Sequence, residues 1–257
     1  MKGIVLLGGN GTRLRPLTYI LPKSLLPIYN QPLALYPLSV LLRAGINDIV
    51  VVTAQEQLDR FREFLGNGER LGAKISYVTQ EKPLGIAHAV GMAEPYCEGE
   101  DIAVVLGDNI FEDDLTPAIE TFRRQNFKKE GKRVSGSRLI LKQENDPRRF
   151  GVAELRGDLI VDIVEKPKEP KSNWITTGFY MFDNRAFDVI KGLKPSWRGE
   201  LEITDLANFY VKEKTATYEK IKGQWFDVGT IESRHKACRF IAKSKKIKPY
   251  LPNSEKS

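Results

Sequence analysis

Cysteine and histidine are scarce in this 257-residue sequence, which has two of each. Cys97 and Cys238 lie far apart without the spacing of metal ligands, and His88 and His235 do not complete a set. The sequence therefore argues against a zinc site. So few cysteines are typical of a reducing compartment, and we expect a cytoplasmic protein.

Long apolar runs are also missing. No stretch approaches the roughly 20 apolar residues that a membrane-spanning helix needs. The first apolar stretch, Gly3 to Leu7, is short and runs directly into glycines. The sequence therefore predicts no membrane partner and no signal peptide.

Acidic residues are sparse at the C-terminal end, and this explains the net charge. Residues 236–257 hold six lysines and one arginine against one glutamate, a charge of +6, which leaves about +1 of the total +7 for the other 235 residues. A charged, proline-containing end is usually solvated. We therefore expect a basic tail and no nucleic-acid partner; a binding arm is the alternative.

Short β-branched apolar runs alternate with helical patterns in the first half. The runs expected to be strands are 3–7, 48–52, 74–78 and 101–106, and the expected helices are about 33–44, 55–65 and 85–95. This alternation predicts a mostly parallel sheet with helical crossovers. Ligands in such sheets collect beyond the carboxyl ends of the strands.

The second half has longer, partly alternating runs, which indicate antiparallel strands. The expected strands are 138–143, 151–155, 159–165 and 174–182, with a turn at Arg156-Gly157-Asp158, and helices follow at about 185–191, 203–213 and 231–244. Thr204 or Asp205 is the expected start of the second of these helices. The mild change in composition favours two lobes of one domain.

A glycine turn, Gly8-Gly9-Asn10-Gly11, follows the first strand. It lacks the third glycine of a dinucleotide-binding fingerprint and does not match a Walker A loop. Three cations follow, Arg13, Arg15 and Lys23, and Lys23 lies between two prolines. A guanidinium fork and a lysine point charge suit a triphosphate, whereas glycines alone would fit a plain strand–turn–helix junction.

Two aspartates occupy positions suited to a metal ion. Asp108 follows the fourth apolar run. Asp227 follows the aromatics Trp225 and Phe226 and precedes Gly229. Mg²⁺ prefers one or two carboxylates together with substrate phosphates. The alternatives are a capped turn for Asp108 and a helix N-cap for Asp227.

Two further segments, 164–173 and 194–200, place cations beside proline or glycine. By themselves, these segments read as solvated loops.

Taken in order, these motifs resemble those of the sugar-1-phosphate nucleotidyltransferases, and most closely the thymidylyltransferases. The matching stretches are "GGNGTRLRPLT", "PKSLLPIYNQPLALYPLSVLLRAGI", "LGDNIF", "RRFGVAEL", "EKPKEPKSNWITTGFY", "RGELEITD" and "WFDVGT". The resemblance implies an α/β, Rossmann-like mixed sheet, mostly parallel, with helices on both faces and a small antiparallel sugar-binding lobe. It also implies a nucleotidyltransferase domain over 1–235, with a nucleotide-binding part at about 1–111 and a sugar-phosphate-binding part at about 112–230, followed by a helix end and basic tail over 236–257.

The resemblance also implies roles for individual residues. The implied catalytic residues are Arg13, Lys23 and Lys166. The implied nucleotide-binding residues are Leu6, Gly8, Gly9, Gly11, Thr12, Arg13, Lys23, Gln80, Pro83 and Gly85. The implied sugar-phosphate-binding residues are Asn109, Gly151, Glu165, Lys166, Thr176 and Arg198, and the implied Mg²⁺ ligands are Asp108 and Asp227.

The implied reaction joins dTTP to glucose 1-phosphate and gives dTDP-glucose and pyrophosphate, and use of UTP is an alternative. A phosphate oxygen attacks the α-phosphorus directly, which agrees with the lack of a Ser/His/Asp or Cys/His arrangement in the sequence. The amide of Gln80 complements the edge of thymine or uracil and opposes that of cytosine. Use of another sugar phosphate, or a non-catalytic protein that binds nucleotide-sugars, are the alternatives; the missing glycine disfavours a nicotinamide oxidoreductase.

Two positions depart from the family pattern. Leu7 stands where an alanine commonly precedes the glycine pair, and His88 stands where glutamine is common in the thymidylyltransferases. Because family members commonly assemble, we expect a homodimer or homotetramer.

Overall fold

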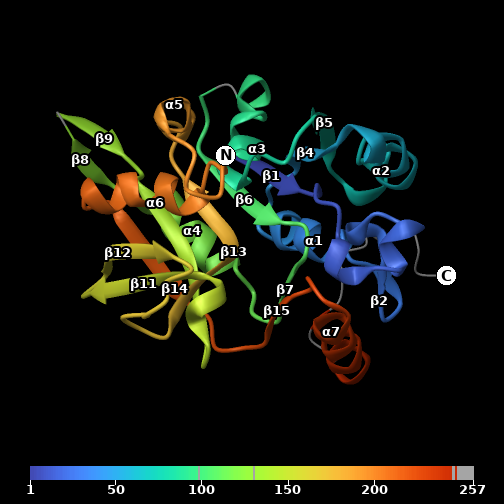
Figure 1. The fold of residues 1–257 in the computed structure, drawn as a ribbon. Coiled ribbons are helices and arrows are strands. Elements are labelled where there is room, and N and C mark those ends of the chain that lie inside the picture. The colour runs from blue at the N-terminus through green and yellow to red at the C-terminus, as the bar shows by residue number, and fades with distance from the viewer. Residues whose placement is uncertain (98, 130, 245–246, 248–257) are drawn as a thin grey trace. The chain divides into compact units, whose positions relative to one another are not determined.

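A computed structural model describes residues 1–97, 99–129, 131–244 and 247 (Figure 1). The chain divides into two compact units. The N-terminal unit comprises Lys2–Pro83, Val105–Thr116 and Gly223–Ser257, and the central unit comprises Leu84–Val104 and Pro117–Lys222 together with Met1. The expected basic tail falls largely on residues 245–246 and 248–257, which lie outside the described residues.

The N-terminal unit is built on three parallel strands. They are β1 (Lys2–Leu6), β4 (Asp48–Ala54) and β5 (Lys74–Gln80), in the order β1-β4-β5. Strands β1 and β4 are buried along almost their whole length, as their continuous apolar runs predicted, whereas β5, at the edge of the sheet, buries only Ile75 and Val78. The predicted parallel pairing in this half of the sequence is therefore confirmed.

Helices connect these strands. Helix α1 (Leu35–Arg43) carries Pro37 in its first turn, where proline lacks only an amide that would have no partner within the helix. Helix α2 (Leu58–Leu65) buries Phe61 and Leu65. The short elements of this unit are η1 (Thr12–Leu14), η2 (Leu17–Tyr19), η3 (Lys23–Leu25), β2 (Pro27–Ile28), β3 (Gln31–Pro32), η4 (Gln55–Gln57) and η5 (Glu69–Leu71).

The C-terminal part of the N-terminal unit packs on two short strands that the sequence did not reveal. After β6 (Ile102–Leu106), β7 (Asn109–Phe111) pairs antiparallel with β15 (Trp225–Asp227), and α7 (Ile231–Lys243) follows. A capping box of Thr230 and Ser233 starts α7. The apolar cluster beneath these elements is formed by Ile28, Leu33, Tyr36, Ile110, Val228, Ala237, Ile241 and Ile247.

The central unit contains a mainly antiparallel set of strands in the order β10-β14-β12-β11-β13. They are β10 (Ser137–Gln143), β11 (Gly151–Arg156), β12 (Leu159–Glu165), β13 (Trp174–Phe182) and β14 (Ala216–Lys220). Only β10 and β14 pair in parallel among the pairs that we describe in this unit. Gly157, with φ +58°, turns β11 into β12 as predicted. The prediction of a mixed α/β sheet with an antiparallel part is confirmed.

The remaining elements belong mostly to the central unit. They are α3 (Ile86–Gly91), η6 (Glu94–Tyr96), α4 (Thr116–Arg124), β8 (Phe127–Lys129), β9 (Lys132–Val134), η7 (Pro147–Arg149), α5 (Ala186–Gly192) and α6 (Ile203–Lys212). The sequence patterns missed α4 and β14. The expected start of α6 was wrong: Glu202 occupies the N-cap position, and the Thr204 hydroxyl instead donates to Glu165. No helix in the described part of the chain is long and apolar enough to cross a membrane.

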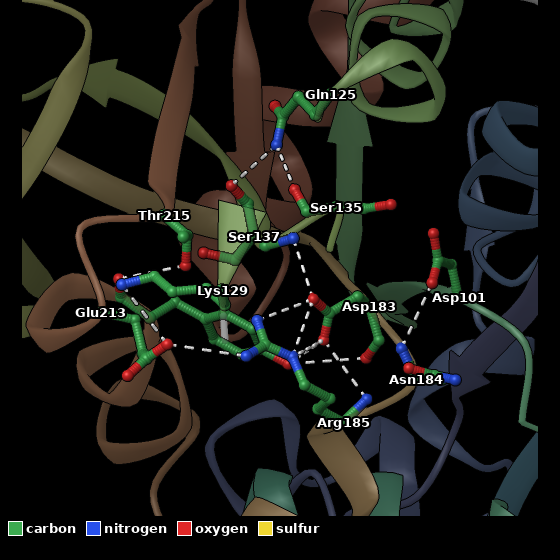
Figure 2. A network of polar contacts seen from close by, with 12 residues as sticks. Asp101, Gln125, Lys129, Ser135, Ser137, Asp183, Asn184, Arg185, Glu213 and Thr215 are labelled. Carbon is green, nitrogen blue, oxygen red and sulfur yellow. Dashed lines mark hydrogen bonds and ion pairs between the residues drawn. The ribbon is translucent and has the colours of Figure 1, made fainter. Parts of the chain in front are cut away.

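A buried carboxylate joins the elements of the central unit (Figure 2). The side chain of Asp183, just after β13, is 4% exposed and accepts hydrogen bonds from the Gly136 amide at 2.9 Å, the Tyr210 hydroxyl at 2.9 Å and Arg185 Nη2 at 2.9 Å. Burial, and then the charge of Asp183, raise the pKa of Tyr210. Arg185 also pairs with Glu213, so the network ties the entry of β10 and the exit of β13 to α6.

Replacing this carboxylate should destabilise the protein strongly. Asp183→Ala leaves a buried amide, a buried hydroxyl and a guanidinium without their shared acceptor, so we expect a loss of roughly 3–5 kcal/mol in the free energy of unfolding. Urea denaturation measures the loss. Asp188→Ala is the control, because that side chain is 85% exposed and pairs with Lys191 at 3.6 Å. Equal stability of the two variants would contradict the prediction.

Candidate active site

The glycine turn of the N-terminal unit follows β1 and needs glycine at position 11. Gly11 has φ +55°, and a Cβ there would lie 2.8 Å from Thr18 Cγ2 and 3.2 Å from Lys23 Cβ. Thr18 Oγ1 also donates to the Gly11 carbonyl at 2.8 Å. The turn is therefore closed against the segment that carries Thr18 and Lys23.

Lys23 and Asp108 form a close ion pair. Lys23 Nζ lies 2.5 Å from Asp108 Oδ2, and the two side chains are 16% and 17% exposed. Burial alone would raise the pKa of Asp108, but the charge and hydrogen bond of Lys23 outweigh it and hold the pKa below its usual value. Asp108 is therefore an ionised carboxylate at neutral pH.

The backbone before Asp108 is fixed by a close approach of two strand ends. The Gly107 amide donates to the Leu6 carbonyl at 2.9 Å. A Cβ at Gly107 would lie 2.6 Å from both that carbonyl oxygen and Leu7 Cδ2. Leu7, the departure from the family pattern, is 1% exposed, so its larger side chain fills the core beside Gly107.

Asp227 and Arg13 are brought to the same place. The pairing of β7 and β15 sets Asp227 opposite Asn109, and the Val228 amide donates to the Asp108 carbonyl at 2.8 Å. A Cβ at Gly229 would lie 3.2 Å from Asp227 Oδ1 and 3.0 Å from Arg13 Nη2. The contacts of Gly11, Asp108 and Gly229 therefore bring together the segments that carry these two carboxylates and two cations.

Asn109 has a buried amide with both ends bonded. The residue is 2% exposed; its Nδ2 donates to Asp108 Oδ1 at 2.8 Å, and its Oδ1 accepts from Trp225 Nε1 at 2.6 Å. These bonds orient Asp108. The sequence alone assigned no role to Trp225, one of the two aromatics before Asp227.

The remaining predicted nucleotide-binding residues of this unit lie at the carboxyl edge of its strands. Leu6 ends β1, and Gln80 ends β5 opposite Ala54 of β4. Gly8 and Thr12 follow in the glycine turn and η1, and Pro83 is exposed. Gly85 belongs to the central unit.

The acidic residues fit a hard divalent cation. No group of three or more histidine, cysteine, aspartate or glutamate side chains is placed to bind a metal within the described ranges. Asp108 and Asp227 supply carboxylate oxygens, the ligand type of hard divalent cations, whose remaining positions phosphate oxygens and water can fill.

A polar cradle in the central unit gathers two of the predicted sugar-binding residues, Glu165 and Thr176, around a third, Gly151. A Cβ at Gly151 would lie 2.7 Å from Thr176 Oγ1, 3.3 Å from Glu165 Oε2 and 3.3 Å from Thr204 Oγ1. Thr204 Oγ1 donates to Glu165 Oε2 at 2.6 Å. Sequence reasoning missed Thr204, although it lies within the "RGELEITD" stretch. The cradle presents hydroxyl and carboxylate oxygens above a glycine.

Lys166 lies at the edge of the cradle in an unusual backbone conformation. Its φ is +46°, which non-glycine residues rarely adopt, and its amide donates to the Phe150 carbonyl at 3.0 Å. Its Nζ lies 3.5 Å from Glu165 Oε1. Strained positions of this kind concentrate at functional sites.

Arg198 lies in the loop between α5 and α6. Its guanidinium pairs with Glu200 at 2.9 Å and with Glu202 at 3.3 Å. The same loop meets the predicted base-binding segment of this unit: the Leu201 amide donates to the Leu84 carbonyl at 2.8 Å, and a Cβ at Gly85 would lie 2.4 Å from the Leu201 carbonyl oxygen. Glycine is therefore required at position 85.

Both units carry groups that suit phosphate and sugar ligands. The N-terminal unit has cations, carboxylates and a glycine turn. The central unit has a cradle of hydroxyl and carboxylate oxygens, together with the cations Lys166 and Arg198. The family model for nucleotidyl transferases matches residues 2–244. The chain belongs to this nucleotidyl transferase family.

Relatives and solved structures agree with this assignment. The chain is 44% identical over 245 residues to a glucose-1-phosphate thymidylyltransferase of Neisseria meningitidis, which covers 94% of the chain and 82% of the relative. A Xanthomonas campestris enzyme of the same name is 43% identical, with 93% and 80% covered. A crystal structure of a Bacillus anthracis protein assigned to the same activity, in complex with sucrose, has a TM-score of 0.88 at 41% identity, with 97% of this chain and 98% of that chain covered.

Gly107→Ala should disturb the placement of Asp108. The added methyl meets a backbone oxygen and Leu7 at 2.6 Å, so we expect a loss of about 1–3 kcal/mol in unfolding free energy and, because Asp108 shifts, about 10²-fold lower turnover. Gly192→Ala is the control, since nothing lies within 4 Å of its added Cβ. Urea denaturation and initial rates measure both effects. Gly107→Ala with wild-type stability and rate would contradict the assigned strand approach.

Proposed function

We propose that this protein condenses dTTP with glucose 1-phosphate to give dTDP-glucose and pyrophosphate. The observation that carries the proposal is the meeting of the segments that carry Lys23, Arg13, Asp108 and Asp227, with Lys23 already paired to Asp108. The names of the relatives support the same reaction. The part at about 1–111 would serve the nucleotide and the part at about 112–230 the sugar phosphate.

In this proposal the cations of the N-terminal unit lower the barrier to attack. Both reactants are anions, so their repulsion contributes to the barrier. Lys23 neutralises charge on the phosphates as it develops, and Arg13 binds the leaving pyrophosphate. Asp108 holds Lys23 in place before substrate enters, since the pair is already formed.

Asp108 and Asp227 would hold a magnesium ion. When bound, Mg²⁺ would supply positive charge to the triphosphate oxygens and so favour departure of pyrophosphate. Asn109 and Trp225 keep Asp108 oriented for this role through their chain of hydrogen bonds.

The central unit would bind glucose 1-phosphate. Over Gly151, the Glu165 carboxylate accepts hydrogen bonds from sugar hydroxyls and the Thr176 hydroxyl donates to them. Lys166 and Arg198 bind the phosphate. No protein nucleophile is needed, because the sugar phosphate oxygen itself attacks the α-phosphorus. Positioning of the two reactants then supplies much of the acceleration.

Gln80 would read the base. Its amide presents a donor and an acceptor to the N3–H and O4 edge of thymine or uracil. Use of UTP is the second candidate, because the same edge occurs in both bases. A cytoplasmic location and assembly as a homodimer or homotetramer remain predictions.

Pyrophosphate release tests the proposed function directly. The purified protein is mixed with Mg²⁺ and glucose 1-phosphate and, separately, with dTTP, UTP, CTP, ATP or GTP. We expect release with dTTP well above the other four. Preference for UTP would retain the reaction and refute the choice of base, and no release with any nucleotide would refute the reaction with this sugar.

Lys23→Ala should lower turnover by about 10²–10³-fold, because a preorganised charge on the phosphates is lost. Lys2→Ala is the matched control: Lys2 forms an ion pair with Asp48 at 2.6 Å in the same unit, and its side chain is 11% exposed. Rates are compared at a temperature where both variants are folded by circular dichroism. Similar rates for the two variants would refute the catalytic role of Lys23.

A further inference from the structure

Arg198, the proposed phosphate ligand of the central unit, is occupied by carboxylates of its own chain. Its Nη2 lies 2.9 Å from Glu200 Oε1, and its Nη1 lies 3.3 Å from Glu202 Oε1. A sugar phosphate must therefore share or replace one of these partners.

The two carboxylates differ in how firmly they are held. The Glu202 side chain is 7% exposed, and Ser196 Oγ donates to it at 2.8 Å. The Glu200 side chain is 32% exposed. The Glu200 carboxylate is therefore the partner that leaves Arg198 at the lower cost, since water can solvate it.

Backbone hydrogen bonds of the loop fix the position of Arg198 independently of the Glu200 side chain. The Arg198 amide donates to Ser196 Oγ at 3.2 Å, and the Gly199 amide donates to the Ser196 carbonyl at 2.8 Å. The Leu201 amide anchors the loop to Leu84 at 2.8 Å. Loss of the Glu200 carboxylate consequently leaves the guanidinium on the same backbone and still paired with Glu202.

We propose that Glu200 is an internal counter-ion of Arg198 that the phosphate of the substrate displaces. This inference rests on the proposed function, which makes Arg198 a phosphate ligand. A phosphate dianion offers two charges and bidentate oxygens to the guanidinium fork, and so replaces a single carboxylate.

Other acidic groups remain near Arg198 after Glu200 leaves. Glu202 still pairs with the guanidinium. Asp205, in the first turn of α6, lies close enough to Glu202 to feel its charge: burial, and then Glu202, raise the pKa of Asp205. Because these carboxylates repel anions, removal of Glu200 relieves only part of the competition that a phosphate meets, and the expected gain in affinity is modest.

Glu200→Gln tests the proposal. The substitution keeps the shape of the side chain and removes the competing charge, so the affinity for inorganic phosphate at about pH 8 should rise roughly two- to fivefold, the value of a partly exposed ion pair. Calorimetric titration of the full-length protein measures it. Glu219→Gln is the matched control, because it removes the same charge from another Arg–Glu pair, with Arg138, in the same unit.

The gain should disappear when Arg198→Ala is combined with Glu200→Gln. Equal phosphate affinity of Glu200→Gln and the wild-type protein, absence of binding in both, or an equal gain in Glu219→Gln would each overturn the proposal. These measurements use no nucleotide and no turnover, so they separate this inference from the proposed reaction.

In the enzymatic assay the same variant should lower KM for glucose 1-phosphate about two- to fivefold and leave kcat nearly unchanged. Glu200 is displaced in both the bound state and the transition state, so its removal changes only binding. A fall in kcat with KM unchanged would instead indicate a structural role for Glu200.

Discussion

The ion pair between Lys23 and Asp108 is the contact around which the N-terminal unit is organised. It joins the segment after the glycine turn to the loop after β6, two stretches separated by 85 positions in the sequence. The pair requires a close approach of Gly107 to Leu6 that excludes any side chain at position 107. On the other side of the same loop, the bond from Val228 to Asp108 brings in Asp227. One short loop thus fixes a cation, two carboxylates and the start of α7.

Charged side chains in both units are paired before any ligand is present. Lys23 pairs with Asp108, Lys166 with Glu165, and Arg198 with Glu200 and Glu202. Such pairs place the cations where anionic phosphates are expected. A substrate phosphate must then replace these ion pairs when it binds. The degree of exposure decides which partner gives way: a buried, hydrogen-bonded carboxylate such as Glu202 stays, and a solvated one such as Glu200 leaves.

Local patterns in the sequence predicted most of the fold. The runs at 3–7 and 48–52 became β1 and β4 because continuous apolar, β-branched segments are stable only when both faces are covered, and the mixed run at 74–78 became the edge strand β5. Strands β7 and β15 were missed because three residues are too few to show a period, and they exist only through their pairing with each other. Helix α6 starts before Thr204 because that hydroxyl serves Glu165 instead of the helix end.

The proposed site residues came from motifs, but their partners came from the structure. Nothing in the sequence shows that Thr204 faces Glu165 or that Trp225 holds Asn109, since these contacts join segments far apart in the chain.

The proposed reaction depends on direct attack of one substrate on the other. The most direct test uses dTTP made chiral at the α-phosphorus with sulfur, and determines the configuration of the nucleotide-sugar product. A single in-line displacement predicts inversion at phosphorus. Retention would require a covalent nucleotidyl-protein intermediate and would contradict the account.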